Sequence, residues 1–135
     1  MAKQGNSYEV ALKPPYLNWG DYRNPTNRDF IDGEGYIPIP RDRAEIFGVF
    51  NSNHDPKGLG YNMFYASSAD GFLDEVLLLA QGCSNAGDVY AKQFSVKGDL
   101  KKIGSWYKYC NAKPGDIVKV RWISSTEILL EFIRT

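Results

Sequence analysis

Histidine and cysteine are scarce in this sequence, and their scarcity narrows the catalytic chemistry open to it. The 135 residues include one histidine, His54, and two cysteines, Cys83 and Cys110. A nucleophile–histidine–acid triad would depend on His54, and no serine or cysteine nucleophile signature lies near it. The cysteines form no CxxC pair and have no histidine at a metal-ligand spacing. We therefore expect two free thiols in a reducing compartment, with no metal site and no cofactor.

The chain also lacks an excess of charge and a long apolar run. Lysine plus arginine equals aspartate plus glutamate at 16 each, so net charge indicates no particular partner. No run approaches the roughly 18 apolar residues of a membrane span, and the first residues lack the apolar core of a signal peptide. A phosphate-binding loop of the GxxxxGKS type is absent. These observations predict a cytoplasmic protein with no membrane contact.

What the chain does contain is enough apolar material for one folded domain. Hydrophobic residues make up 43% and aromatic residues 14% of the sequence, which predicts a single domain over residues 1–135 with residues 1–7 as a flexible lead-in. The charges are unevenly distributed. Residues 1–91 hold 7 basic and 12 acidic residues, whereas residues 92–135 hold 9 basic and 4 acidic residues. One end of the fold is therefore expected to present a positive surface.

The hydrophobic pattern predicts an α+β, mostly β, fold: a seven-stranded, closed or nearly closed antiparallel barrel with two short helices. The two prolines in residues 36–40 restrict that strand to a sheet edge. The turn at residues 69–71, with its Asp-Gly pair, predicts a hairpin. The strands are expected at residues 8–12, 36–40, 61–66, 72–80, 88–94, 117–123 and 128–133, and the helices at residues 41–47 and 101–110.

A long polar loop precedes the proline-rich strand. Loops of this length in small domains are usually functional or disordered, and its interleaved aromatic residues argue against disorder. Its guanidinium, amide and carboxylate groups match the donor and acceptor edges of bases, although the same residue types also form ordinary turns in which arginines pair with acids. The candidate DNA contacts in this loop are Asp21, Arg23, Asn24, Asn27, Arg28 and Asp29.

A second region, residues 92–108, holds five lysines and one acid. Lysines on a turn and at the start of a helix suit phosphate contacts, because both their charge and the helix N-terminal amides attract anions. An ordinary solvated face is the alternative. The candidate phosphate contacts in this region are Lys92, Lys97, Lys101, Lys102 and Lys108.

One pattern within the second region imitates a nuclease site. Asp88, followed by Asp99 and Lys101, matches the acid and acid-x-lysine arrangement that holds magnesium in many restriction nucleases. Such a site needs the second acid on a strand that faces the first. Gly98 precedes Asp99 and a helix follows, so the pattern favours a turn, and we expect no catalytic residue in this chain.

Several motifs resemble one family of DNA-recognition domains. Residues 17–20 (Leu-Asn-Trp-Gly), residues 35–40 (Gly-Tyr-Ile-Pro-Ile-Pro) and the short helix after them resemble the recognition domain of NgoFVII-type restriction endonucleases. That domain is related to the effector domain of EcoRII and to plant B3 transcription-factor domains. Residues 103–108 resemble a further segment of the domain, and residues 112–118 resemble the Leu-Lys-x-Gly-Asp-Val-Val turn and strand of B3 domains.

The resemblance implies a DNA-binding pseudobarrel whose two arms enter the major groove. The arms would correspond to about residues 18–32 and 92–102. This correspondence adds Asn18, Trp19, Gln93, Ser95 and Asp99 to the candidate DNA contacts. The expected function is sequence-specific binding of double-stranded DNA as the non-catalytic recognition module of a restriction-modification enzyme. A nuclease domain would lie on the same chain or on a partner chain. A small magnesium nuclease and a protein- or carbohydrate-binding barrel remain as alternatives.

Overall fold

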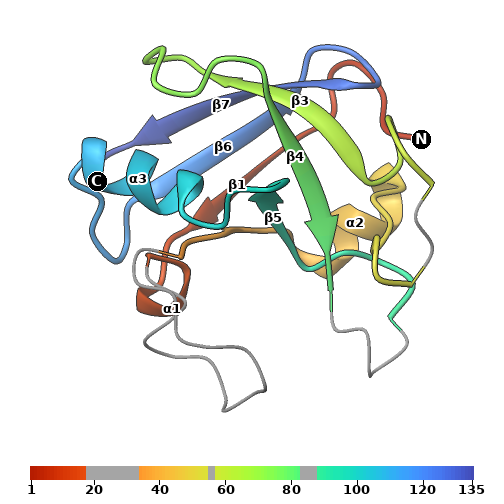
Figure 1. Cartoon of the computed structure of the whole chain (residues 1–135), viewed down its shortest axis with the longest axis horizontal. Coiled ribbons are helices and arrows are strands. Elements are labelled where there is room, and N and C mark those ends of the chain that lie inside the picture. Colours follow the sequence, from red (N-terminus) through yellow and green to blue (C-terminus); the bar gives the residue numbers. More distant parts are fainter. Residues whose placement is uncertain (18–33, 55–56, 83–87) are drawn as a thin grey trace.

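The structure is a computed structural model that describes residues 1–17, 34–54, 57–82 and 88–135. The described residues form one seven-stranded sheet with three short helices (Figure 1). The elements are β1 (Ser7–Ala11), α1 (Pro14–Leu17), β2 (Ile37–Pro38), α2 (Arg41–Phe47), β3 (Met63–Ser68), β4 (Val76–Gln81), β5 (Gln93–Val96), α3 (Lys102–Tyr109), β6 (Ile117–Trp122) and β7 (Glu127–Ile133).

The sheet runs in the order β1-β6-β7-β3-β4-β5-β2 and is mixed. β3 and β7 pair in parallel, whereas the other neighbours pair antiparallel. The predicted mostly β, nearly closed barrel is confirmed, but the prediction of a purely antiparallel one is wrong. A parallel pair needs a long crossover between its strands. Here the crossover contains β4, β5, α3 and β6, so no local turn signals it.

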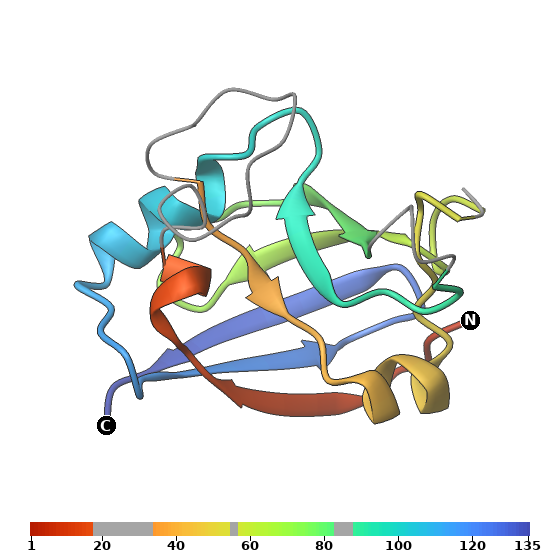
Figure 2. The same ribbon diagram turned by 90° about the horizontal axis from the view of Figure 1, so that it is seen from below.

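β1 and β2 are the two edges of the sheet, and they approach each other where the barrel nearly closes. The buried Tyr8 hydroxyl on β1 donates a hydrogen bond to the Pro38 carbonyl on β2 at 3.0 Å. Figure 2 shows the two strands side by side, with α1 and α2 at opposite ends. The position of β2 confirms the edge that its prolines predict, because a proline offers no N–H to a further strand.

The core of the barrel is built around Trp122. Its ring contacts Phe47, Phe64 and Phe94, with centroid distances of 5.6, 5.5 and 6.3 Å. Val118 and Val120 precede it on the same inward face of β6 and are also buried. The predicted alternation of residues 117–123 is confirmed, and aromatic packing from α2, β3 and β5 fixes these elements around β6.

Two of the three described helices lie where the sequence predicts them. α2 has the predicted bounds and ends at Gly48, whose φ of 72° is the left-handed conformation that glycine adopts readily. α3 lies within the predicted range and buries Ile103, Trp106 and Tyr107. α1 is not among the predicted helices. Proline suits the first turn of a helix, where its missing N–H costs nothing, and here Pro14 begins α1.

Two strands begin at least four residues after their predicted start. β4 begins at Val76 rather than at residue 72, because Asp70 organises a longer turn after β3. The Asp70 carboxylate accepts hydrogen bonds from the Ser68 hydroxyl at 2.5 Å and from the Phe72 N–H at 2.9 Å. β5 covers Gln93–Val96 rather than residues 88–94, so Ser95, which lies beyond the predicted strand, belongs to the sheet.

The first residues lie against the barrel. Ala2 is buried, and its N–H donates to the Gly60 carbonyl at 3.3 Å. The Gly5 N–H donates to the Trp122 carbonyl at 2.9 Å, which extends the ladder between β1 and β6. The expected flexible lead-in is thus bonded to the sheet over residues 2–6.

Candidate nucleic-acid interface

The candidate contacts of the first arm lie outside the described residues. They are Asn18, Trp19, Asp21, Arg23, Asn24, Asn27, Arg28 and Asp29. The chain on either side of this segment is described. Leu17 ends α1 before it, and Glu34 follows it. We call the described residues on either side of this segment, 16–17 and 34–36, the stem of the first arm.

The two sides of this stem are bonded to each other. The Tyr36 N–H donates to the Tyr16 carbonyl at 3.1 Å. The Tyr36 hydroxyl donates to Glu34 Oε2 at 2.6 Å, and Glu34 has no exposed surface. A buried carboxylate needs hydrogen-bond donors to offset its desolvation. Tyr36 therefore joins the two sides of the stem and stabilises the buried carboxylate of Glu34.

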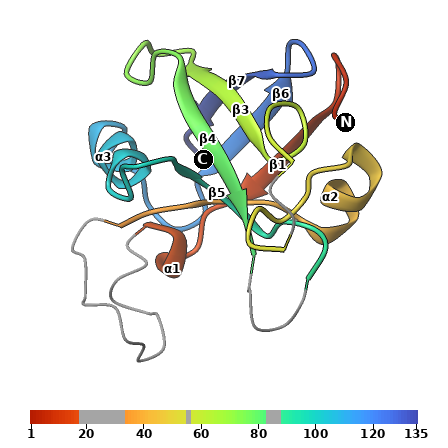
Figure 3. The same ribbon diagram turned by 45° about the vertical axis from the view of Figure 1, so that its right-hand side comes forward.

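α3 packs directly on the same stem. A β-carbon added to Gly35 would lie 2.9 Å from Gly104 Cα, so the two backbones approach this closely because residue 35 has no β-carbon. The buried Tyr107 hydroxyl donates to the Tyr36 carbonyl at 2.6 Å. Figure 3 shows α1 and α3 on the same side of the barrel. The fold thus brings the stem of the first arm against α3, the helix in which the lysine-rich region ends.

Four of the lysines surround α3. Lys97, Lys101 and Lys108 are exposed, and Lys102 is half-buried with its ammonium 5.1 Å from the centre of the Phe72 ring. Within the described part of the chain, none of these four ammonium groups lies within 4.0 Å of a carboxylate. The described carboxylates thus leave these four lysine charges unneutralised.

The turn between β5 and α3 is a tight one that Asp99 organises. Asp99 Oδ1 accepts the Lys101 N–H at 3.1 Å, and the Asp99 N–H donates to the Val96 carbonyl at 3.0 Å. Gly98 has a φ of 81°, a conformation that L side chains rarely adopt. Asp99 is exposed, but its carboxylate shapes the turn that presents Lys97 and Lys101.

The other three candidates of this region precede the turn. Lys92 lies immediately before β5, and Gln93 and Ser95 lie within it. Ser95 is only 1% exposed and donates to Gln81 Oε1 at 3.0 Å, so in this conformation it has no surface with which to contact DNA. Gln93 is half-buried opposite Pro38 and Gln81 in the sheet. Lys92 is exposed, and its ammonium lies 2.8 Å from Asp88 Oδ2.

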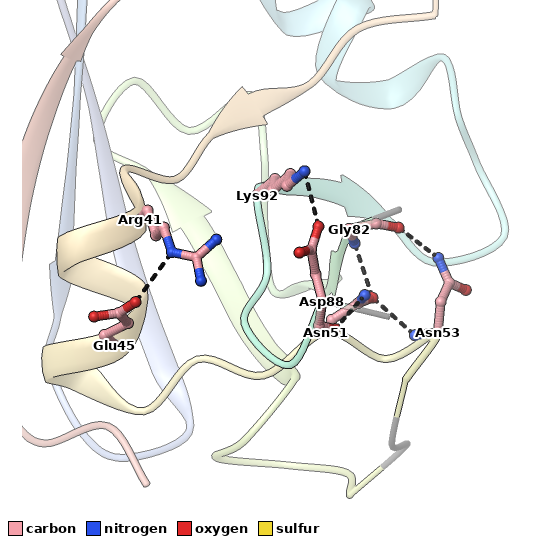
Figure 4. A network of polar contacts seen from close by, with 7 residues as sticks. All are labelled: Arg41, Glu45, Asn51, Asn53, Gly82, Asp88 and Lys92. Carbon is pink, nitrogen blue, oxygen red and sulfur yellow. Dashed lines mark hydrogen bonds and ion pairs between the residues drawn. The ribbon is translucent and has the colours of Figure 1, made fainter. Parts of the chain in front are cut away.

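A buried amide that the sequence did not reveal holds the chain near Lys92 (Figure 4). Asn51 has no exposed surface, although asparagine is typical of exposed turns. Its Oδ1 accepts the Gly82 N–H at 2.8 Å, and its Nδ2 donates to the Asp88 carbonyl at 3.0 Å. Asn53 Nδ2 donates to the Gly82 carbonyl at 3.0 Å. Asn51 therefore ties together the two ends of residues 82–88.

The two acids of the nuclease-like pattern lie beyond opposite ends of β5. Asp88 lies before β5 and pairs with Lys92, whereas Asp99 lies beyond its other end and bonds to the Lys101 backbone. The side-chain hydrogen bond and charge of Lys92 hold the pKa of Asp88 below its ordinary value. Among the described residues, no three His, Cys, Asp or Glu side chains are grouped as metal ligands.

Hydrogen bonds to Asp70 anchor α3 to the turn after β3. Trp106 Nε1 donates to Asp70 Oδ2 at 2.9 Å, and the Cys110 thiol donates to the same oxygen at 3.4 Å. Burial raises the pKa of Asp70, but the hydrogen bonds from Ser68, Trp106, Phe72 and Cys110 outweigh it and leave the pKa below its ordinary value. Burial, followed by the hydrogen bond to Asp70, raises the pKa of Cys110 to about 12. The prediction of a free thiol is confirmed for Cys110, whereas Cys83 lies outside the described residues.

Comparison with known proteins supports the fold. No protein-family profile matches the sequence, and neither does any curated protein. The structure is similar to the N-terminal domain of Helicobacter pylori LlaJI.R1, with a TM-score of 0.51 and 13% sequence identity over 95% of this chain and 87% of that one. At this identity the likeness establishes a shared fold. In addition, none of the helices in the described ranges is long and apolar enough to cross a membrane.

Proposed function

We propose that this chain is a sequence-specific double-stranded DNA-binding module of a restriction-modification system. Its structural neighbour is a domain of a restriction-modification protein, which supports a DNA-related function. The proposal goes further and assigns the chain a B3-like recognition mode, in which two arms enter the major groove. A nuclease domain on the same or a partner chain would make the cut, in the cytoplasm.

The observation that carries the proposal is the contact between the stem of the first arm and α3. Gly35 lies against Gly104, and Tyr107 bonds to Tyr36. The described residue that follows the first segment thus lies against the helix that carries Lys102 and Lys108, which supports one common surface for both segments. Rigid positioning of contact groups lowers the entropy that binding costs.

The two segments have complementary roles in this proposal. Residues 16–34 hold two arginines and four acids, so the first arm contributes base contacts more than charge. Arg23 and Arg28 would bind guanine edges bidentately, and Asn24 and Asn27 would pair with adenine. The lysines around α3 would neutralise phosphates and supply most of the affinity.

A salt titration of duplex binding tests this division. The wild-type chain should bind a mixed-sequence duplex with an affinity that falls steeply with salt, whereas the double variant Lys97→Ala, Lys101→Ala should bind more weakly with a shallower slope. Each lost phosphate contact reduces the slope by about 0.9. Lys3→Ala, which removes an exposed lysine before β1, is the matched control. Equal slopes for all three proteins would contradict the proposed phosphate contacts.

Incubation with plasmid and magnesium tests the assignment as a non-catalytic module. The proposal predicts intact plasmid. Cleavage by the pure chain that disappears in Asp99→Ala would instead establish a magnesium nuclease.

A further inference from the structure

A groove of about 400 Å³ lies on the outer face of the sheet, where β3 and β7 run in parallel. Its principal lining residues are Tyr65, Ser67, Glu75, Ile123, Glu127 and Leu129. Figure 1 shows β3 and β7 at the top of the molecule and α1 at the bottom. The groove is therefore separate from the stem of the first arm.

The register of the parallel pair creates the groove. Tyr65 lies opposite Glu127, and Ser67 lies opposite Leu129. The residues that alternate with them, such as Ala66 and Ile128, are buried in the core, so these four point outward. Tyr65 and Ile123 remain 43% and 45% exposed, and they give the groove an aromatic and an aliphatic wall.

The groove carries two carboxylates and no cation among its lining residues. The Glu75 N–H donates to the Ser67 hydroxyl at 2.9 Å, which holds Glu75 at the edge of the groove. Among the described residues, the Glu127 carboxylate accepts a long hydrogen bond, 3.4 Å, from the Ser124 hydroxyl. Arg121 lies on the neighbouring strand opposite Leu129. Within the described residues, neither glutamate has a cationic partner within 4.0 Å.

We propose that this groove docks an arginine side chain from a partner polypeptide. The charge of the groove selects a cation and repels nucleic acid, whose phosphates would meet two carboxylates. A guanidinium is planar and weakly hydrated, so it stacks on an aromatic face such as Tyr65 while it pairs with a carboxylate. Its aliphatic stem suits the wall formed by Ile123 and Leu129. The groove thus gives the module a protein-docking surface separate from its proposed DNA-binding surface.

An NMR titration of the intact ¹⁵N-labelled chain tests the proposal. The probe is a capped pentapeptide with one central arginine, compared with the same peptide carrying citrulline, the neutral isostere, or lysine. The arginine peptide should cause saturable shifts at the amides of Tyr65, Ile123 and Glu127. The lysine peptide should bind several-fold more weakly, and the citrulline peptide should cause no shifts.

The double variant Glu75→Gln, Glu127→Gln should lose at least tenfold in affinity for the arginine peptide while its other amide signals stay in place. Glu131→Gln, an outward-facing residue further along β7, is the control and should bind as the wild type does. Equal binding of the citrulline peptide, or unchanged affinity in the double variant, would overturn the proposal. Duplex DNA added alone should leave the groove amides unshifted, and shifts there would assign the face to nucleic acid. Because the peptide readout involves no DNA, it stands or fails independently of the proposed function.

Discussion

Gly35 and Gly104 bring two distant parts of the chain into backbone contact. A β-carbon on Gly35 would lie 2.9 Å from Gly104 Cα and 3.0 Å from Gly104 N, closer than real β-carbons approach backbone atoms. Gly35 follows the first arm, and Gly104 lies in the first turn of α3. This contact holds the residue that follows the first proposed DNA-binding segment against the helix that carries Lys102 and Lys108.

Gly35→Ala should therefore separate the stem from α3. We expect a loss of about 1–3 kcal/mol in the free energy of unfolding, because the added methyl group meets backbone rather than a flexible side chain. Urea unfolding measures this loss. Duplex affinity should also fall under conditions in which the variant is fully folded. Ser105→Ala, on the exposed side of α3, should change neither quantity, and a Gly35→Ala protein with wild-type stability would contradict the close contact.

Tyr107→Phe tests the second link between α3 and the stem. The variant keeps the ring but removes the hydroxyl that donates to the Tyr36 carbonyl at 2.6 Å. The expected loss is roughly 0.5–1.5 kcal/mol in the free energy of unfolding, which is typical for one hydrogen bond. Tyr109→Phe is the matched control, because Tyr109 is an exposed residue of the same helix that stacks on Phe72. If both variants lost equal stability, the hydroxyl of Tyr107 would have no special role.

Cys110 should react slowly with alkylating reagents at neutral pH. Its pKa of about 12 leaves almost all of it protonated, and only the thiolate is nucleophilic. In a Cys83→Ala background, the iodoacetamide rate should rise about tenfold per pH unit from pH 7 to 10.

Asp70→Asn should increase that rate at pH 8, because it removes the negative charge that helps to raise the pKa of the thiol. Asp74→Asn, which alters an exposed carboxylate of the same connection, should leave the rate unchanged. A rate that is already pH-independent at pH 8 would show that the thiol is ionised and would contradict the bond between Cys110 and Asp70.

Substitutions in the two arms should affect specificity and affinity differently. Arg23→Ala or Arg28→Ala should relax the preference at single base positions by about 1–3 kcal/mol. Lys101→Ala should weaken binding to all duplexes alike, because phosphate contacts carry no sequence information. Competition binding with single-base variants of the preferred site measures both effects. Equal losses on specific and random duplexes for both kinds of variant would contradict the proposed roles.

The sequence predicted the local elements better than the way they assemble. The bounds of α2 and the edge position of β2 follow from proline and glycine, whose backbone constraints act within a few residues. The parallel pairing of β3 with β7 depends on contacts between residues about sixty positions apart, and no local pattern encodes it. α1 was missed because its four residues are too few to show a helical period.

The candidate site shows the same limit. The lysines around α3 were recognised from their charge and are exposed, apart from the half-buried Lys102. Ser95 was included by position alone. It is buried because it lies in the sheet, where its hydroxyl donates to Gln81 of the neighbouring strand. Asn51 was missed because a buried asparagine that bonds to Gly82 and Asp88 has the same sequence signal as a turn residue.

Enrichment from a random duplex pool tests the central claim most directly. The intact chain should select duplexes that share one short motif, and the selected motif should bind at least a hundredfold more tightly than a shuffled duplex at physiological salt. Arg23→Ala, Arg28→Ala protein should select a shorter or more degenerate motif. A pool that stays flat after repeated rounds, although the protein is folded, would contradict sequence-specific DNA recognition.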